Sequence, residues 1–304
     1  MRRREFITLG GAAVIWPLAA SAQQTGVPIV GFLHAGSPQP YTQQVTGFLQ
    51  GLSETGFVEG QNVVIEYRWA ENEYSRLPDL AADIVRRGVQ VIATAGGPAS
   101  VRAAKAATTT IPIVFSVGAD PIKMGLVASL NHPGGNVTGV TFLTNDLVGK
   151  QLELLRELVP TAKVIGYLVN PTNPDFEPGM NDVQAPARIV GQVIHVVPVS
   201  TERDLEVAFA GLRKLRAGAL LISPDSLFTS EREQLARMAL QHAMPAMYQY
   251  RDFALAGGLI SYGVDLIDTY RQHGLYTGRV LKGARPADLP VMQPTKFSLV
   301  INLV

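Results

Sequence analysis

Short apolar runs rich in valine and isoleucine alternate along this chain with longer segments whose apolar residues recur at helical spacing. The first run, residues 27–33, is uniformly apolar, as expected of a strand covered on both faces. A segment of helical period follows at 39–55 and closes at Gly56. Because the strand-then-helix order keeps repeating, the pattern predicts parallel sheets with helices packed on both faces.

The repeats fall into two groups. The first group predicts strands at 27–33, 62–69, 89–94, 111–115 and 137–142. The second predicts strands at 164–169, 193–197, 219–222 and 246–248, with helices at 147–159, 176–190, 202–216 and 230–243. We therefore expect an α/β protein with two doubly wound, Rossmann-like lobes joined by a hinge near 142–146.

The predicted first lobe comprises residues 27–141 and the second comprises 142–254. Three late elements follow, at 257–262, 269–282 and 297–303. We expect about 255–282 to complete the first lobe and about 283–304 to complete the second.

The N-terminus has the pattern of an export signal. Three arginines at positions 2–4 precede a nearly uncharged stretch at 6–18, and Ala20-Ser21-Ala22 supplies the small residues that a signal peptidase requires. The apolar stretch is shorter than the roughly 20 residues that span a bilayer. We expect cleavage after Ala22 and a periplasmic protein, exported by the twin-arginine or the general route.

Composition narrows the functional classes. Cysteine is absent, which excludes disulfides, thiolate metal sites, a cysteine nucleophile and a lipid-modified N-terminal cysteine. The formal net charge is +1 at pH 7, so no nucleic-acid partner is indicated. The sequence has no G-x-S-x-G, H-E-x-x-H, G-x-G-x-x-G or Walker A motif. His34 and Ser37 share one short loop and lack an orienting third group. We therefore expect no enzyme, no cofactor and no metal.

Candidate binding residues follow the strands, because ligands of open α/β sheets bind outside the carboxyl ends of the strands. In the first lobe these loops are 34–38, 94–100 and 116–121, and in the second they are 170–174, 223–226 and 248–250. Gly96-Gly97-Pro98 either lets a carboxylate approach a helix N-terminus or simply forms a tight turn.

Acidic and aromatic residues in or near these loops leave similar alternatives. Asp120 and Asp225 either face a ligand ammonium group or cap a turn or helix. Tyr248, Tyr250 and Tyr262 either face the cleft or are half-buried core residues.

The chain resembles substrate-binding components of ABC importers with the type I periplasmic binding protein fold, specifically those related to tryptophan/tyrosine-binding proteins. The resemblance covers about residues 28–303. It is carried by five segments: GFLHAGSP at 31–38, residues 48–85, residues 109–142 including TTIPIVFSVGADP, LELLRELVP at 152–160 and QPTKFSLVINL at 293–303. Such proteins usually continue into a further helix, whereas this sequence stops at Val304.

The resemblance implies a monomeric two-lobed receptor that closes on a small amino-acid-like solute and delivers it to a membrane permease with its ATPase. It implies that the loops at Ser37, 96–100 and 117–120 hold the carboxyl end of the solute. The residues expected to bind the solute are His34, Ser37, Gly96, Gly97, Pro98, Ser100, Val117, Gly118, Asp120, Phe142, Asn170, Asp225, Tyr248 and Tyr262.

Two other functions are compatible with the sequence: a ligand sensor with the same fold, and a hydrolase exported to the same compartment. A periplasmic sensor would pass its signal to a membrane partner, and neighbouring genes for a permease and an ATPase would favour transport instead. An exported hydrolase would lose turnover on replacement of Ser37 or Asp225.

Overall fold

The first lobe of the computed structural model, which describes residues 26–294 and 296–303, is built on a five-stranded parallel sheet of order β2-β1-β3-β4-β5. The expected leader at 1–22 lies outside the described residues. The strands are β1 (Ile29–His34), β2 (Val64–Trp69), β3 (Val91–Ala95), β4 (Ile113–Val117) and β5 (Val137–Thr141). Side chains alternate along β1, so Phe32 packs with one apolar cluster and Leu33 with the other.

Helices cover both faces of this sheet. Phe48 and Leu52 of α1 (Thr42–Glu54) share a core with Phe32, and α10 (Leu266–Leu281) lies beside α1. On the opposite face, α2 (Leu77–Arg86) and α3 (Pro98–Ala107) pack against each other. Short 3-10 turns lead into α1 and α2 at η1 (Gln39–Tyr41) and η2 (Tyr74–Arg76). The lobe therefore has the doubly wound form predicted from the sequence.

Glycines allow α1 and α10 to approach closely. A Cβ added at Gly51 would overlap the carbonyl oxygen of Arg271 and lie 2.9 Å from the Leu275 nitrogen. A Cβ at Gly274 would likewise overlap the carbonyl oxygen of Phe48. Because the backbones meet where side chains would otherwise stand, only glycine fits at these two positions.

The second lobe contains a six-stranded sheet of order β11-β10-β9-β8-β6-β7, in which only β11 is antiparallel to its neighbour. Its strands are β6 (Val164–Val169), β7 (Val193–Pro198), β8 (Ala219–Ile222), β9 (Ala246–Tyr248), β10 (Ile260–Gly263) and β11 (Ser298–Ile301). Its helices are α4 (Val148–Leu158), α5 (Phe176–Ile189), α6 (Asp204–Lys214), α7 (Ser226–Ser230), α8 (Arg232–Gln241) and α9 (Arg251–Leu255). The five-residue helices α7 and α9 stand where no helix was expected.

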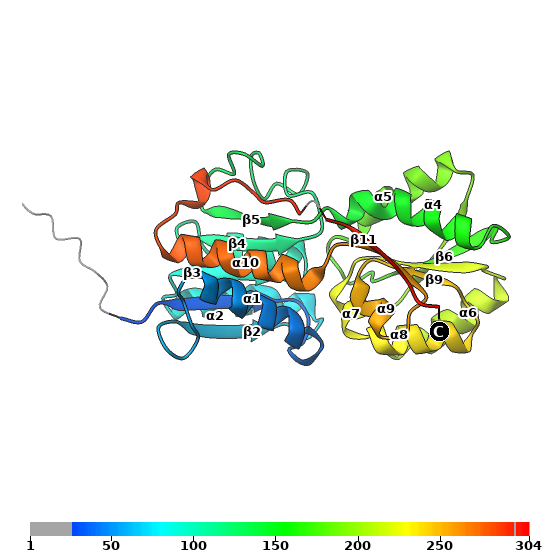
Figure 1. The fold of residues 1–304 in the computed structure, drawn as a ribbon, viewed down its shortest axis with the longest axis horizontal. Helices are drawn as coiled ribbons and strands as arrows, with labels where there is room; N and C mark the ends of the chain where they lie inside the picture. The colour runs from blue at the N-terminus through cyan, green and yellow to red at the C-terminus, as the bar shows by residue number, and fades with distance from the viewer. Residues whose placement is uncertain (1–25, 295, 304) are drawn as a thin grey trace, which may run out of the picture.

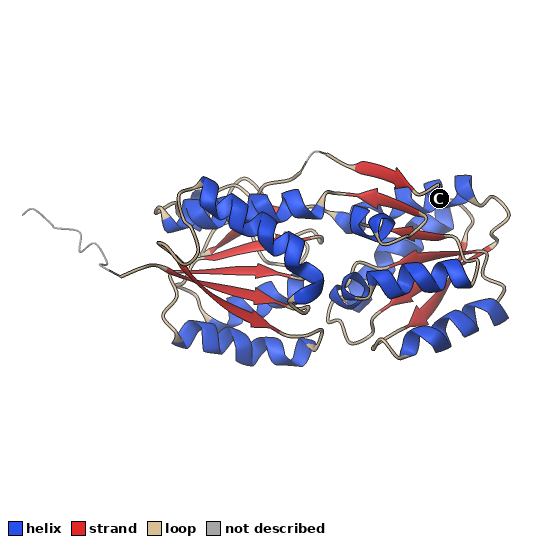
Figure 2. Cartoon of the chain, turned by 60° about the horizontal axis from the view of Figure 1, so that its bottom comes forward, coloured by secondary structure: helices blue, strands red, loops and turns tan. Residues whose placement is uncertain are grey.

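The chain crosses between the lobes three times (Figure 1). It leaves the first lobe after β5, through η3 (Thr144–Leu147), and returns from β10 to α10. After η4 (Pro286–Asp288), Met292 pairs with Val140 of the first lobe before the chain crosses again to β11. Figure 2 shows helices on both faces of each sheet and the last strand reaching across to the second lobe.

The late elements differ from the expected assignment in two places. Strand β10 pairs with β9 and belongs to the second sheet, although about 255–282 was expected in the first lobe. Residues up to Met292 remain with the first lobe, although about 283–304 was expected in the second. The apolar pattern identifies a strand but not the sheet that receives it, because pairing is set by tertiary contacts.

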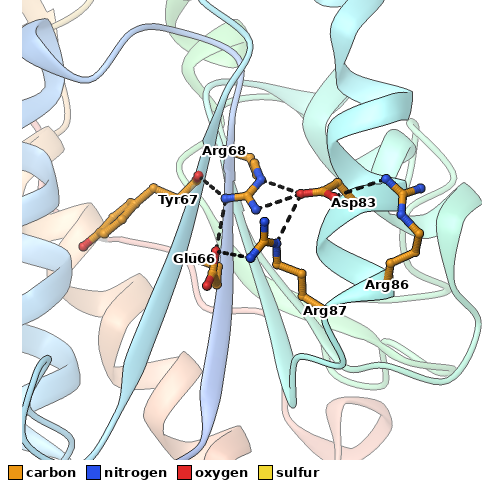
Figure 3. Close-up of polar contacts among 6 residues, drawn as sticks. All are labelled: Glu66, Tyr67, Arg68, Asp83, Arg86 and Arg87. Atoms are coloured by element: carbon orange, nitrogen blue, oxygen red, sulfur yellow. Dashed lines mark hydrogen bonds and ion pairs between the residues drawn. The ribbon is translucent and has the colours of Figure 1, made fainter.

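Charged residues cover the outer strand of the first sheet. Arg68 on β2 forms ion pairs with Glu66 at 3.3 Å and with Asp83 of α2 at 2.7 Å. Arg86 and Arg87 approach Asp83 from the same helix or its end (Figure 3). Charges on an edge strand oppose pairing with another chain, so this network protects the exposed side of the sheet.

Candidate functional site in the cleft between the lobes

A cavity of about 110 Å³ lies between the strand-end loops of the two lobes. The first lobe contributes the loops that follow β3 and β4, together with Tyr41 and Tyr270. The second lobe contributes the loops that follow β6, β8 and β9, together with Phe176 of α5. The cavity therefore occupies the position at which open α/β sheets bind ligands.

Seven of the residues expected to bind the solute line this cavity: Gly96, Gly97, Pro98, Gly118, Phe142, Asn170 and Asp225. The first two have φ angles of +79° and +117°, a conformation that favours glycine. A Cβ at Gly96 would lie 2.8 Å from the backbone nitrogen of Ala35. Pro98 then begins α3, whose first backbone N–H groups have no partner within the helix.

Asp225 is a buried link between the lobes. Its Oδ1 accepts hydrogen bonds from the Leu227 backbone at 2.8 Å and from Asn170 at 3.2 Å. Its Oδ2 accepts hydrogen bonds from Asn173 at 2.7 Å and from the Tyr74 hydroxyl of the first lobe at 2.9 Å. Burial raises the pKa of this carboxyl, and the four donors act in the opposite direction. Asp225 therefore caps α7, as one sequence alternative proposed, and also holds the lobes together.

The other seven expected residues do not line the cavity: His34, Ser37, Ser100, Val117, Asp120, Tyr248 and Tyr262. Val117 belongs to the first-lobe core, because the last strand residue points into the sheet packing. Asp120 accepts hydrogen bonds from the backbones of Ile122 and Lys123, so it caps a turn. Tyr248 is fully buried and stacks on Phe253 with ring centroids 4.7 Å apart.

The remaining four have other surroundings. Tyr262 stacks against Phe297, with ring centroids 6.4 Å apart. Ser100 is buried in the first turn of α3, and Ser37 is partly exposed in the loop after β1. His34 is fully buried and lies within hydrogen-bonding distance, 2.8 Å, of the hydroxyl of Tyr270, which lines the cavity.

Sequence reasoning missed most of the aromatic lining. Tyr41, Tyr167, Phe176 and Tyr270 line the cavity, and none of them was expected there. Tyr250, for which the sequence leaves a place in the cleft or in the core, also lines the cavity. The signal for Tyr250 is its place after β9, whereas Tyr41 lies in the 3-10 turn η1 and Tyr270 in α10, which carry no such signal.

Polar contacts join the lobes around the cavity. Arg102 of α3 forms an ion pair with Asp175, the residue before α5, at 2.7 Å. Arg232 donates a hydrogen bond to the carbonyl oxygen of Pro40 at 3.0 Å, and Gln44 donates to Asp252. The lobes are therefore in mutual contact at the rim of the cavity.

The cavity carries acidic rather than basic side chains. Asp175, Asp182 and Asp225 are in the lining, whereas no lysine or arginine of the described residues is. Residues 26–294 and 296–303 contain no group of three histidine, aspartate or glutamate side chains placed to hold a metal ion. Over the same residues, no helix is long and apolar enough to cross a membrane.

Comparison with known proteins identifies the family. Residues 35–304 match the family model described as ABC transporter substrate binding protein. The tyrosine-binding protein of Clostridioides difficile strain R20291 is 28% identical over 257 residues, covering 84% of this chain and 73% of that protein.

Solved structures share the fold. A conserved domain protein from Vibrio cholerae is 26% identical with a TM-score of 0.82, covering 91% of this chain and 92% of that one. A Streptococcus pneumoniae ABC domain in complex with L-Trp is 24% identical with a TM-score of 0.79 and the same coverage. A leucine-binding protein from Thermotoga maritima has a TM-score of 0.56 and is 16% identical, which shows the type I periplasmic binding fold. This chain belongs to the family of ABC transporter substrate-binding proteins, whose members typically act outside the cytoplasm.

Proposed function

We propose that this protein captures an aromatic L-amino acid in the interlobe cavity and delivers it to the permease and ATPase of an ABC importer. The observation that carries the proposal is the composition of the cavity walls. Tyr41 and Tyr270 line the cavity from one lobe, and Tyr167, Phe176 and Tyr250 line it from the other. Aromatic faces on two walls suit a flat apolar side chain, because stacked and edge-to-face ring pairs add to the free energy of burial.

The polar lining suits the two charges of an amino acid. The N-terminus of α3 offers backbone N–H groups and the positive end of a helix dipole to a carboxylate. Asp182 and Asp225 on the second lobe give that wall a negative potential, which favours an ammonium group. A dianion would find no lysine or arginine among the described lining residues.

The tyrosine-binding relative supports the same ligand class, since it is similar over 84% of this chain. The proposed role includes no chemical change, so the solute should be recovered unaltered after incubation with the protein. Export by the N-terminal leader belongs to the same proposal and rests on the three arginines and the Ala20-Ser21-Ala22 site. Replacing Arg3 and Arg4 with lysine tests the twin-arginine route by cell fractionation.

Thermal unfolding and isothermal titration against the twenty amino acids test the ligand. A ligand at 100 times its dissociation constant stabilises the folded state by about 2.7 kcal/mol, so a true ligand raises the melting temperature by several degrees. We expect tryptophan, tyrosine or phenylalanine to produce the largest shift. If none of the three shifts the transition while another solute does, the proposed ligand class is wrong. Uptake of the radiolabelled solute by cells with and without this gene then tests delivery.

A further inference from the structure

We infer that Tyr270 determines specificity by donating a hydrogen bond to the carboxylate of the bound solute, and that buried His34 positions Tyr270 for this role. The inference deepens the proposed function and rests on it. His34 ends β1, Tyr270 lies on α10 and lines the cavity, and the two side chains are in hydrogen-bonding contact.

The hydrogen bonds of His34 fix which ring nitrogen carries the proton. The backbone N–H of Gly36 donates to Nδ1 of His34 at 2.8 Å, and a backbone nitrogen can only donate. Nδ1 is therefore unprotonated, and the proton of the neutral ring is on Nε2. Nε2 lies 2.8 Å from the Tyr270 hydroxyl oxygen, so the imidazole donates and the tyrosine oxygen accepts.

The surroundings of His34 keep the ring neutral and in place. Burial, with a smaller effect from His273, lowers the pKa of His34 to about 3. The ring packs against Tyr41 and Trp69, with centroid separations of 4.2 and 4.7 Å. The donor on Nε2 therefore points at Tyr270 throughout the neutral pH range.

The hydroxyl of Tyr270 has one proton, which this arrangement directs away from His34. A phenol that accepts from the imidazole must use its own hydrogen elsewhere. The described residues give this hydroxyl no acceptor, and Tyr270 lines the cavity. The hydroxyl consequently presents a donor to whatever occupies the cavity.

A carboxylate is the acceptor that fits, because the first lobe contributes other donors to the cavity lining. A Cβ at Gly96 would lie 3.0 Å from Nδ1 of His34, so the His34 imidazole contacts both Tyr270 and the loop that leads into α3. The Ser116 hydroxyl also lines the cavity, is buried, and has no partner among the described residues. The first-lobe part of the lining thus contains three kinds of donor, a phenol, a serine hydroxyl and the N-terminus of a helix, and a carboxylate can accept from all three.

L-Tryptophan is the sharpest probe, since its indole and ammonium groups donate and only its carboxylate accepts. Tryptamine keeps the ring and the amine but lacks the carboxylate. We expect Tyr270→Phe to weaken L-tryptophan binding about 10- to 100-fold, the range for a hydrogen bond to a charged group. The same variant should leave the weaker tryptamine binding unchanged. Tyr248→Phe, which removes a buried hydroxyl outside the cavity, is the matched control and should bind both probes like the wild type.

His34 is tested by two substitutions and one spectrum. His34→Gln retains a donor near the position of Nε2 and should keep most of the affinity for L-tryptophan, whereas His34→Leu should lose as much as Tyr270→Phe. In the unaltered protein, long-range ¹H–¹⁵N spectra should show His34 protonated on Nε2 and bare on Nδ1. If the spectra show the opposite tautomer, the inference is wrong. This test uses the unaltered protein, so it does not depend on whether a variant folds.

The outcomes separate this inference from the proposed function. If wild-type protein binds no aromatic amino acid, the proposed function fails first. If it binds L-tryptophan and Tyr270→Phe binds it equally well, the function stands and the inference is wrong. A parallel loss of tryptamine binding in Tyr270→Phe would show a packing role instead of recognition of the carboxylate, and would also overturn it.

Discussion

Replacing Gly51 with alanine should destabilise the first lobe, although alanine is the better helix former. The added methyl would overlap the carbonyl oxygen of Arg271 and stand 2.8 Å from its carbonyl carbon. These are backbone atoms of α10, so the helix has to move away as a unit. Overpacking costs about 1–3 kcal/mol and occasionally more, against a gain in helix propensity of about 1 kcal/mol. Because the clash is with rigid backbone, we expect a net loss of about 2 kcal/mol.

The matched control is Gly211→Ala in α6, where an added Cβ meets nothing within 4 Å. Because there is no clash at this position, the higher helix propensity of alanine should stabilise the protein by about 0.5–1 kcal/mol. Urea unfolding followed by circular dichroism, with the solute absent, measures both variants against the wild type. If Gly51→Ala is as stable as Gly211→Ala, α1 and α10 are not in backbone contact and the reasoning about this packing is wrong.

Three further outcomes are expected. Tyr74→Phe removes the hydrogen bond from the first lobe to Asp225, and solute affinity measured by titration should fall about 5- to 100-fold. Arg102→Ala removes the ion pair with Asp175, which is partly exposed, so stopped-flow release should accelerate by no more than about fivefold, and less at high salt. Burial lowers the pKa of His273 to about 4 from 6.5, so the unfolded chain takes up a proton first as the pH falls. Wild-type stability should therefore drop by about 1.4 kcal/mol per pH unit between pH 6 and 4 from this residue, and His273→Gln should remove that part of the slope.

The parts of the site that the sequence predicts are those that follow directly from strand order. Gly96, Gly97 and Pro98 stand at the end of a strand and the start of a helix, so both their backbone conformation and their place in the cavity follow from local pattern. Asn170 and Asp225 were found by the same rule.

The aromatic lining depends on packing that no local pattern encodes. Tyr270 faces the cavity because α10 returns to the first lobe and lies on α1. His34 was expected in the site, yet it ends β1 with its ring among Tyr41, Trp69 and Tyr270. Alternation along a strand places each side chain on one of the two faces of the sheet. The helices that cover that face determine which residues the side chain contacts.

The order of elements along the chain sets when each lobe can be completed during synthesis. The apolar face formed by Phe32, Phe48 and Leu52 is covered by α10, which is made long after the first sheet. The second sheet receives its last strand, β11, later still. Neither half of the molecule can therefore finish folding before almost the whole polypeptide has been made. The growing chain must keep apolar surface exposed for most of its synthesis, which is when such surfaces aggregate or need a chaperone.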